Sequence, residues 1–116
     1  MNDLLINRLM ELPQQIAGNE LQQMELRDQL QATKQQLAGI EISIILEKDE
    51  KEWGSNADKR KVAQQAAFTD NDDWRNVSEV AHGLERSVIA GEIQLNLLRN
   101  TFAALRAVAR LRSTES

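Results

Sequence analysis

Apolar side chains recur at alternating steps of four and three residues in the first part of the chain. Twelve positions follow this spacing and nine of them are apolar; this first seam is Leu5, Leu9, Leu12, Ile16, Asn19, Gln23, Leu26, Leu30, Thr33, Leu37, Ile40 and Ile44. Heptad spacing is typical of a helix that packs along one partner helix. Because proline is tolerated best at the first helical position, Pro13 predicts a short lead-in helix, a kink and a long helix over residues 13–50.

A second seam with the same spacing follows. It consists of Trp74, Val77, Ala81, Leu84, Val88, Gly91, Leu95, Leu98, Phe102, Leu105 and Ala109. Acidic residues stand where this helix should begin and arginines where it should end: Asp70, Asp72 and Asp73, then Arg106, Arg110 and Arg112. Carboxylates cap free amides and favour the positive end of the helix dipole, whereas cations favour the other end. The pattern predicts a helix over residues 71–112.

Between the seams, turn residues predict an elbow. Trp53 and Gly54 should end the first helix, with Gly54 at positive φ, and Ser55 or Asn56 should cap a short helix over residues 56–68. A composition with one proline and no tyrosine favours helix over strand. The two long helices are of similar length, so they can lie antiparallel along each other. We therefore expect an all-α fold in which residues 1–116 form a single domain, a long antiparallel helical hairpin resembling a coiled coil, with a short elbow helix.

The second long helix carries a further apolar row beside its seam. This outer row is Ile89, Ile93, Leu97, Ala104, Val108 and Leu111, and the first helix has similar residues at Leu21, Met24, Ile42 and Ile45. A hairpin hides only the stripe between its two helices, so we expect self-association into a larger helical bundle, a homo-oligomer, to cover the rest. The alternative is that the elbow and the lead-in helix fold back over this surface.

The amino-acid composition excludes several kinds of catalytic and metal-binding site. With no cysteine and one histidine, the chain has no disulfide framework, no catalytic thiol and none of the usual zinc or iron–sulfur ligand sets. His82 has no nucleophile or ligand at a useful spacing, and residues 70–73 lack the glycine and distant glutamate of a calcium loop. We expect no enzyme activity, no cofactor and no metal. No apolar run approaches a membrane span, so we expect no membrane partner and a cytoplasmic location.

Positive charge is the remaining candidate for ligand contact. The net charge of −4 opposes binding by bulk charge, but the tract from Ile93 to Ser113 contains no acid. The candidate contacts for phosphate or for an acidic protein partner are Arg99, Arg106, Arg110 and Arg112 in this tract, and Lys59, Arg60 and Lys61 on the elbow. In an antiparallel hairpin Glu11, Glu20 and Glu25 are available to pair with the arginines. We favour ion pairing of the arginines, within one chain or between subunits, over nucleic-acid contact.

Two segments carry a resemblance to known sequences. Residues 54–60 read Gly-Ser-Asn-Ala-Asp-Lys-Arg, and residues 102–111 read Phe-Ala-Ala-Leu-Arg-Ala-Val-Ala-Arg-Leu. Together they resemble a group of uncharacterised phage and prophage helical proteins with a Gly-x-Asn-Ala-Glu-x-Arg turn and a closing Phe-x-Ala-Leu-Arg helix. Between these segments the resemblance also includes Ala63, Asp70 and an aromatic residue at Trp74. The chain departs from the pattern at Asp58, where glutamate is usual, and at Trp74, where tyrosine is usual.

The resemblance implies a phage-derived setting near genes of DNA replication or recombination, and it brings no assigned activity. The sequence thus predicts a non-enzymatic, self-associating helical adaptor or scaffold of phage or prophage origin. The alternative is an accessory nucleic-acid-binding protein in phage DNA replication or recombination, which would use the arginine tract.

Overall fold

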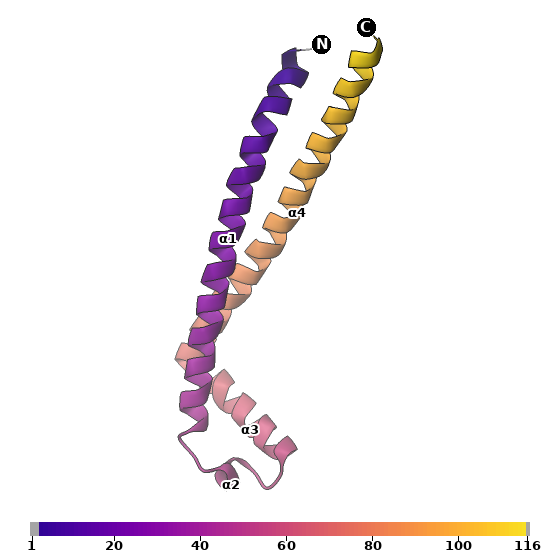
Figure 1. Ribbon diagram of the computed structural model, residues 1–116. Coiled ribbons are helices and arrows are strands. Elements are labelled where there is room, and N and C mark those ends of the chain that lie inside the picture. The colour runs from indigo at the N-terminus through magenta and orange to yellow at the C-terminus, as the bar shows by residue number, and fades with distance from the viewer. Residues whose placement is uncertain (1–2, 116) are drawn as a thin grey trace. The chain divides into compact units, whose positions relative to one another are not determined.

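The fold is an all-α helical hairpin (Figure 1). The computed structural model describes residues 3–115, which form α1 (Asp3–Ile45), α2 (Glu50–Trp53), α3 (Ala57–Asp70) and α4 (Asp72–Glu115), with no strand in that range. The long helices α1 and α4 pair with each other, and α3 is the expected elbow helix. The chain divides into two compact units. The terminal unit holds the chain up to Arg27 and from Arg86 onward, and the elbow unit is Asp28–Glu85.

Both predicted seams form the contact between the long helices. Every described position of the two seams is buried or half-buried, including the polar Asn19, Gln23 and Thr33. In the terminal unit the most buried side chains are Leu12, which is fully enclosed, and Leu5, Leu95 and Leu98. In the elbow unit Ile44, Trp53 and Ala81 are buried. The heptad pattern therefore located the interface correctly on both helices.

The expected break at Pro13 is wrong, because α1 continues through the proline. Proline has no backbone N–H, so the carbonyl of Leu9 loses its helical partner, and the ring opposes the helix locally. Leu5 and Leu12, which precede the proline in the seam, are nevertheless 8% and 0% exposed, and Ile16, the seam residue that follows it, is half-buried. Packing along the seam holds the helix together across a residue that would end an isolated helix.

The first helix ends at Ile45 rather than near residue 50, and a short helix α2 follows. Neither glycine nor proline marks this point in the sequence. The indole of Trp53 is 6% exposed, and its nitrogen donates a hydrogen bond of 2.9 Å to the Ile45 carbonyl. This contact satisfies one of the carbonyls left free at the end of α1. The ammonium of Lys48 lies 4.8 Å from the centre of the same ring.

Gly54 does not take the left-handed conformation, the positive φ of a helix C-cap, that we expected. Its backbone is extended, with φ 160° and ψ 162°. Glycine is instead required by close approach, since a Cβ at this position would lie 2.9 Å from the backbone nitrogen of Arg60 and 2.9 Å from the Cβ of Lys59. Asn56 caps α3 as predicted, and its side-chain oxygen accepts a hydrogen bond of 2.9 Å from the Lys59 amide.

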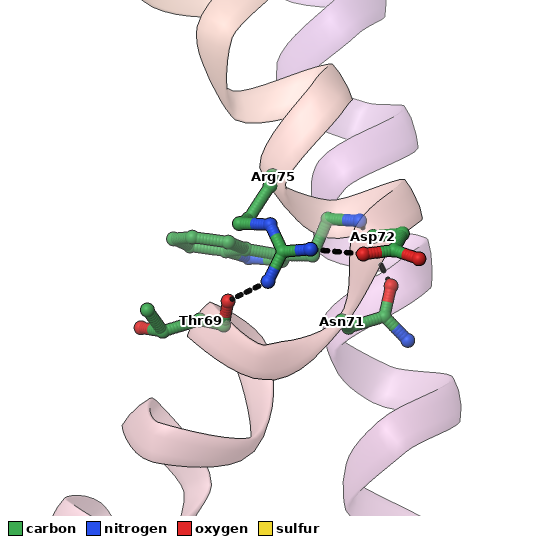
Figure 2. Close-up of polar contacts among 5 residues, drawn as sticks. Thr69, Asn71, Asp72 and Arg75 are labelled. Carbon is green, nitrogen blue, oxygen red and sulfur yellow. Dashed lines mark hydrogen bonds and ion pairs between the residues drawn. The ribbon is translucent and has the colours of Figure 1, made fainter.

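A single residue, Asn71, separates α3 from α4 and caps the second of these helices. Its side-chain oxygen accepts a hydrogen bond of 2.9 Å from the Trp74 amide. The predicted capping group was the flanking aspartates, but Asp70 ends α3 and Asp72 pairs with Arg75. Figure 2 shows Arg75 between Asp72 and the Thr69 carbonyl, to which it donates a bond of 2.9 Å. One guanidinium thus joins the end of α3 to the start of α4.

Candidate interaction surfaces

Two charged pairs cross between α1 and α4 on one side of the terminal unit. Arg99 lies 3.4 Å from Glu20, and Arg27 pairs with Glu92. Arg27 follows Glu20 by seven residues and Glu92 precedes Arg99 by seven, so the pairs repeat once per heptad in an antiparallel alignment. The four side chains are 47% to 58% exposed. Exposed pairs of this kind contribute about 0.2–1 kcal/mol each, so they select the alignment more than they stabilise it.

A polar contact in the terminal seam combines a glutamine with a glycine. Gln23 is 5% exposed, and its amide nitrogen donates a hydrogen bond of 2.9 Å to the Val88 carbonyl on α4. The side chain occupies the space left by Gly91, where an added Cβ would lie 1.9 Å from the Gln23 amide oxygen. The sequence already shows both residues as exceptions in their seams, since Gln23 is polar and Gly91 has no side chain. That they face each other depends on the alignment of the helices, which the sequence pattern does not specify.

The arginine tract is only partly neutralised. Of the predicted acidic partners, Glu20 pairs with Arg99, whereas Glu11 lies 3.9 Å from Arg8 on its own helix. Among residues 3–114, no arginine lies within 4 Å of the Glu25 carboxylate. Arg106 lies 5.6 Å from the ring of Phe102. Within residues 3–114, no carboxylate lies within 4 Å of the three remaining arginines of the tract, Arg106, Arg110 and Arg112. Within one chain the first helix therefore supplies a partner to one of the four arginines, and pairing of the other three between subunits stays a prediction.

On the elbow, the basic cluster separates into one structural and two exposed residues. Arg60 lies 3.4 Å from Glu50, and it donates a hydrogen bond of 3.5 Å to the Gly54 carbonyl. These contacts tie α3 to α2 and its connection, so Arg60 is not available to a ligand in this arrangement. Lys59 and Lys61 are exposed, and no carboxylate of the described residues pairs with either.

The outer row of α4 remains uncovered. Ile89, Ile93, Leu97 and Leu111 are 58%, 66%, 58% and 65% exposed. Val108 is 38% exposed, and Ala104 is also classed as exposed. On α1, Leu21, Met24 and Ile42 are exposed, while Ile45 is half-buried. The lead-in residues continue α1 rather than folding back, so the alternative is wrong for the lead-in helix. Coverage by the elbow stays a prediction.

The histidine and the carboxylates of the described residues form no further candidate site. His82, the single histidine, is exposed on α4. Among residues 3–115 no three His, Asp or Glu side chains gather closely enough to hold a metal ion. Over the same range, none of the helices combines the length and the apolar character needed to cross a lipid bilayer.

No family model, curated protein or solved structure matches this chain.

Proposed function

We propose that the protein is a non-enzymatic helical adaptor or scaffold that works by association through the outer row of α4. The observation that supports this is the exposure of Ile89, Ile93, Leu97 and Leu111, each more than half open to solvent on a helix whose other apolar stripe is already buried. Removing such a surface from water is favourable, and contiguous apolar patches commonly mark protein contacts.

The setting of this proposal follows from the sequence. The resemblance of residues 54–60 and 102–111 to phage and prophage helical proteins supports a phage-derived origin. A chain without cysteine is compatible with the reducing cytoplasm, where we expect it to act.

The mass of the particle in solution tests the association. Light scattering on the purified chain at about 100 µM should give at least twice the 13.1 kDa of one chain. Ile93→Asp, which puts a charge in the outer row, should return the mass to that of one chain. Asn96→Asp changes an exposed α4 residue outside the row and should leave the mass unchanged. A wild-type particle of 13.1 kDa would refute the proposal.

A second candidate function rests on a different observation. Arg106, Arg110 and Arg112 have no carboxylate partner in residues 3–114, so three cations per chain are available for phosphate. Three phosphate contacts give a salt dependence of about −2.7 in log K against log salt, which means weak binding at physiological salt. The overall charge of −4 opposes such binding further.

Filter binding with single- and double-stranded DNA over a salt series separates the two functions. The adaptor proposal expects no submicromolar binding at about 150 mM salt, where such a shallow slope leaves little affinity. Submicromolar binding that disappears on replacing Arg106, Arg110 and Arg112 together by glutamine would instead favour the accessory nucleic-acid-binding protein.

A further inference from the structure

The outer row of α4 is nearly symmetric about Asn100. Steps of four, four, seven, four and three residues keep its members on one helix face, and Asn100 lies on the same face between Leu97 and Ala104. Ile89 and Leu111 both lie eleven residues from Asn100. Within seven residues of Asn100, the large side chains of Ile93 and Leu97 precede it on this face, and three alanines follow it, Ala103, Ala104 and Ala107. Val108 comes directly after them.

We propose that the partner of the outer row is a second copy of this chain, packed with its α4 antiparallel to the first and with a two-fold axis at Asn100. A two-fold contact uses the same patch on both chains, so the patch must complement itself. In the antiparallel arrangement Leu97 of each copy lies at the level of Ala103 of the other, one residue from Ala104, and Ile93 lies at the level of Ala107. Large side chains then fill the space above small ones, as packed helices require.

A parallel arrangement would lack this fit. Ile93 would meet Ile93 and Ala104 would meet Ala104, so the contact would be crowded at one end and open at the other. It would also bring together the acid-free tracts of both copies, each with Arg99, Arg106 and Arg110. Like charges held side by side repel, which disfavours this alignment.

Charge complementarity favours the antiparallel alignment. With the axis at Asn100, the level of Arg110 on one copy lies two residues, or about 3 Å along the helix, from that of Glu92 on the other, a step that the two long side chains can span. Glu92 is 47% exposed, and although it pairs with Arg27, a carboxylate has four lone-pair sites and can accept a second donor. Arg110 has no carboxylate partner among residues 3–114. The second copy therefore supplies a carboxylate partner that residues 3–114 of a single chain do not provide.

Asn100 provides the means of holding the alignment. It is exposed on the single chain and is the polar side chain at the centre of an otherwise apolar row. At a two-fold axis the two Asn100 amides face each other, and each amide both donates and accepts hydrogen bonds. A single asparagine at an apolar helix interface specifies alignment at some loss of affinity.

The size of the contact indicates its strength. From Ile89 to Leu111 the row extends about 33 Å along the helix at 1.5 Å per residue, and a helix is about 10 Å wide. A strip of roughly 330 Å² in outline per chain has the size of a functional apolar patch, and two such strips make a contact smaller than that of a stable dimer, so the association is weak. We therefore expect a dimer that dissociates in the micromolar range.

Because the natural chain contains no cysteine, single introduced cysteines give a clean test of the alignment. The variants are Asn100→Cys, Leu97→Cys and Ala104→Cys, with Gln31→Cys, an exposed site on α1 in the elbow unit, as the collisional control. Each is oxidised at about 100 µM, above the expected dissociation constant, and run on a non-reducing gel. Asn100→Cys alone should form a linked dimer, at least tenfold more than Gln31→Cys does.

The off-axis cysteines decide the direction of the helices. Leu97→Cys and Ala104→Cys should each link poorly alone, and a mixture of the two, one of them carrying a mass tag, should form the linked heterodimer. The pair Ile93→Cys with Ala107→Cys repeats this test should Asn100→Cys weaken the dimer. Self-linking of Leu97→Cys and of Ala104→Cys that equals the mixture would show a parallel dimer and overturn the inference.

This inference rests on the proposed function, and light scattering of the wild-type chain distinguishes their failures. A dimeric wild-type chain whose row cysteines link no better than Gln31→Cys would overturn the antiparallel contact and leave association through another surface. A wild-type chain that stays at 13.1 kDa would overturn both. Linked heterodimers from the two off-axis mixtures would support the antiparallel contact and also the proposed association through the outer row.

Discussion

Gln23 and Gly91 act as one feature, because the glycine leaves the space that the amide fills. The amide is buried and makes its hydrogen bond to the Val88 carbonyl 2.9 Å away. A buried polar group without a partner is costly, so this contact disfavours any sliding of α4 along α1 that would separate the two residues. Polar seam residues commonly specify alignment in this way.

Alanine substitution of the glycines separates this packing role from helix propensity. Gly91→Ala should destabilise the protein by about 1–3 kcal/mol, because its Cβ would overlap the buried Gln23 side chain. Gly18→Ala is the matched control, since a Cβ there meets nothing within 4 Å. It should stabilise by about 0.5–1 kcal/mol through helix propensity alone. Urea unfolding followed by circular dichroism measures both values.

A double variant checks the cause. Gln23→Ala combined with Gly91→Ala removes the overlapping side chain, so it should be more stable than Gly91→Ala alone. If instead the losses of unfolding free energy from the two single variants add up in the double variant, the contact with Gln23 is not the reason that glycine is required at position 91.

At the scale of single helices, the caps are local and can be tested one at a time. Asn56→Ala should destabilise the elbow unit by about 1 kcal/mol, because the Lys59 amide loses its acceptor at the start of α3. Ser55→Ala is the control, because the neighbouring serine makes no capping bond. Trp53 and Trp74 both lie in the elbow unit, so the emission of tryptophan during urea unfolding reports on this unit. Equal losses from the two variants would show that Asn56 is not the effective cap.

Two adjacent leucines on α4 distinguish its two apolar faces. Leu98 is 8% exposed in the seam and Leu97 is 58% exposed in the outer row. Leu98→Asp should abolish folding, because the seam has no cation arranged to meet a buried carboxylate, and Leu105→Asp at a half-buried seam position should do the same. Leu97→Asp should retain the helical circular dichroism signal and lose association.

The comparison also checks the assignment of the faces. Retained helicity and an unchanged melting temperature in Leu98→Asp would mean that the seam was misplaced. An unfolded Leu97→Asp would mean that the outer row belongs to the core of a single chain.

At the scale of the whole molecule, association should make stability depend on concentration. A partner that binds only the folded chain stabilises it by mass action. For a dimer of this size the melting temperature should rise by about 3 °C for each tenfold increase in protein concentration. Circular dichroism melts from about 5 to 500 µM measure this, and Leu97→Asp should remove the dependence. A melting temperature that is constant over this range would contradict folding linked to association.

The sequence determined the features that depend on neighbouring residues alone. The heptad spacing located both seams, because a helix returns to the same face every three or four residues whatever its partner is. The Asn56 cap was predictable for the same reason, since the side chain and the amide that it accepts from lie three residues apart. The excess of apolar residues outside the seams was likewise visible from spacing.

Tertiary structure decided every feature that joins residues distant along the chain. The helix continues through Pro13 because Leu5 and Leu12 pack on α4, and it ends at Ile45 because Trp53 folds back onto that carbonyl. The alignment of the two long helices decides which arginine pairs with a carboxylate. It also decides that Gln23 lies against Gly91. Spacing along one helix is the same for every alignment with its partner, so only the packed pair determines which side chains meet.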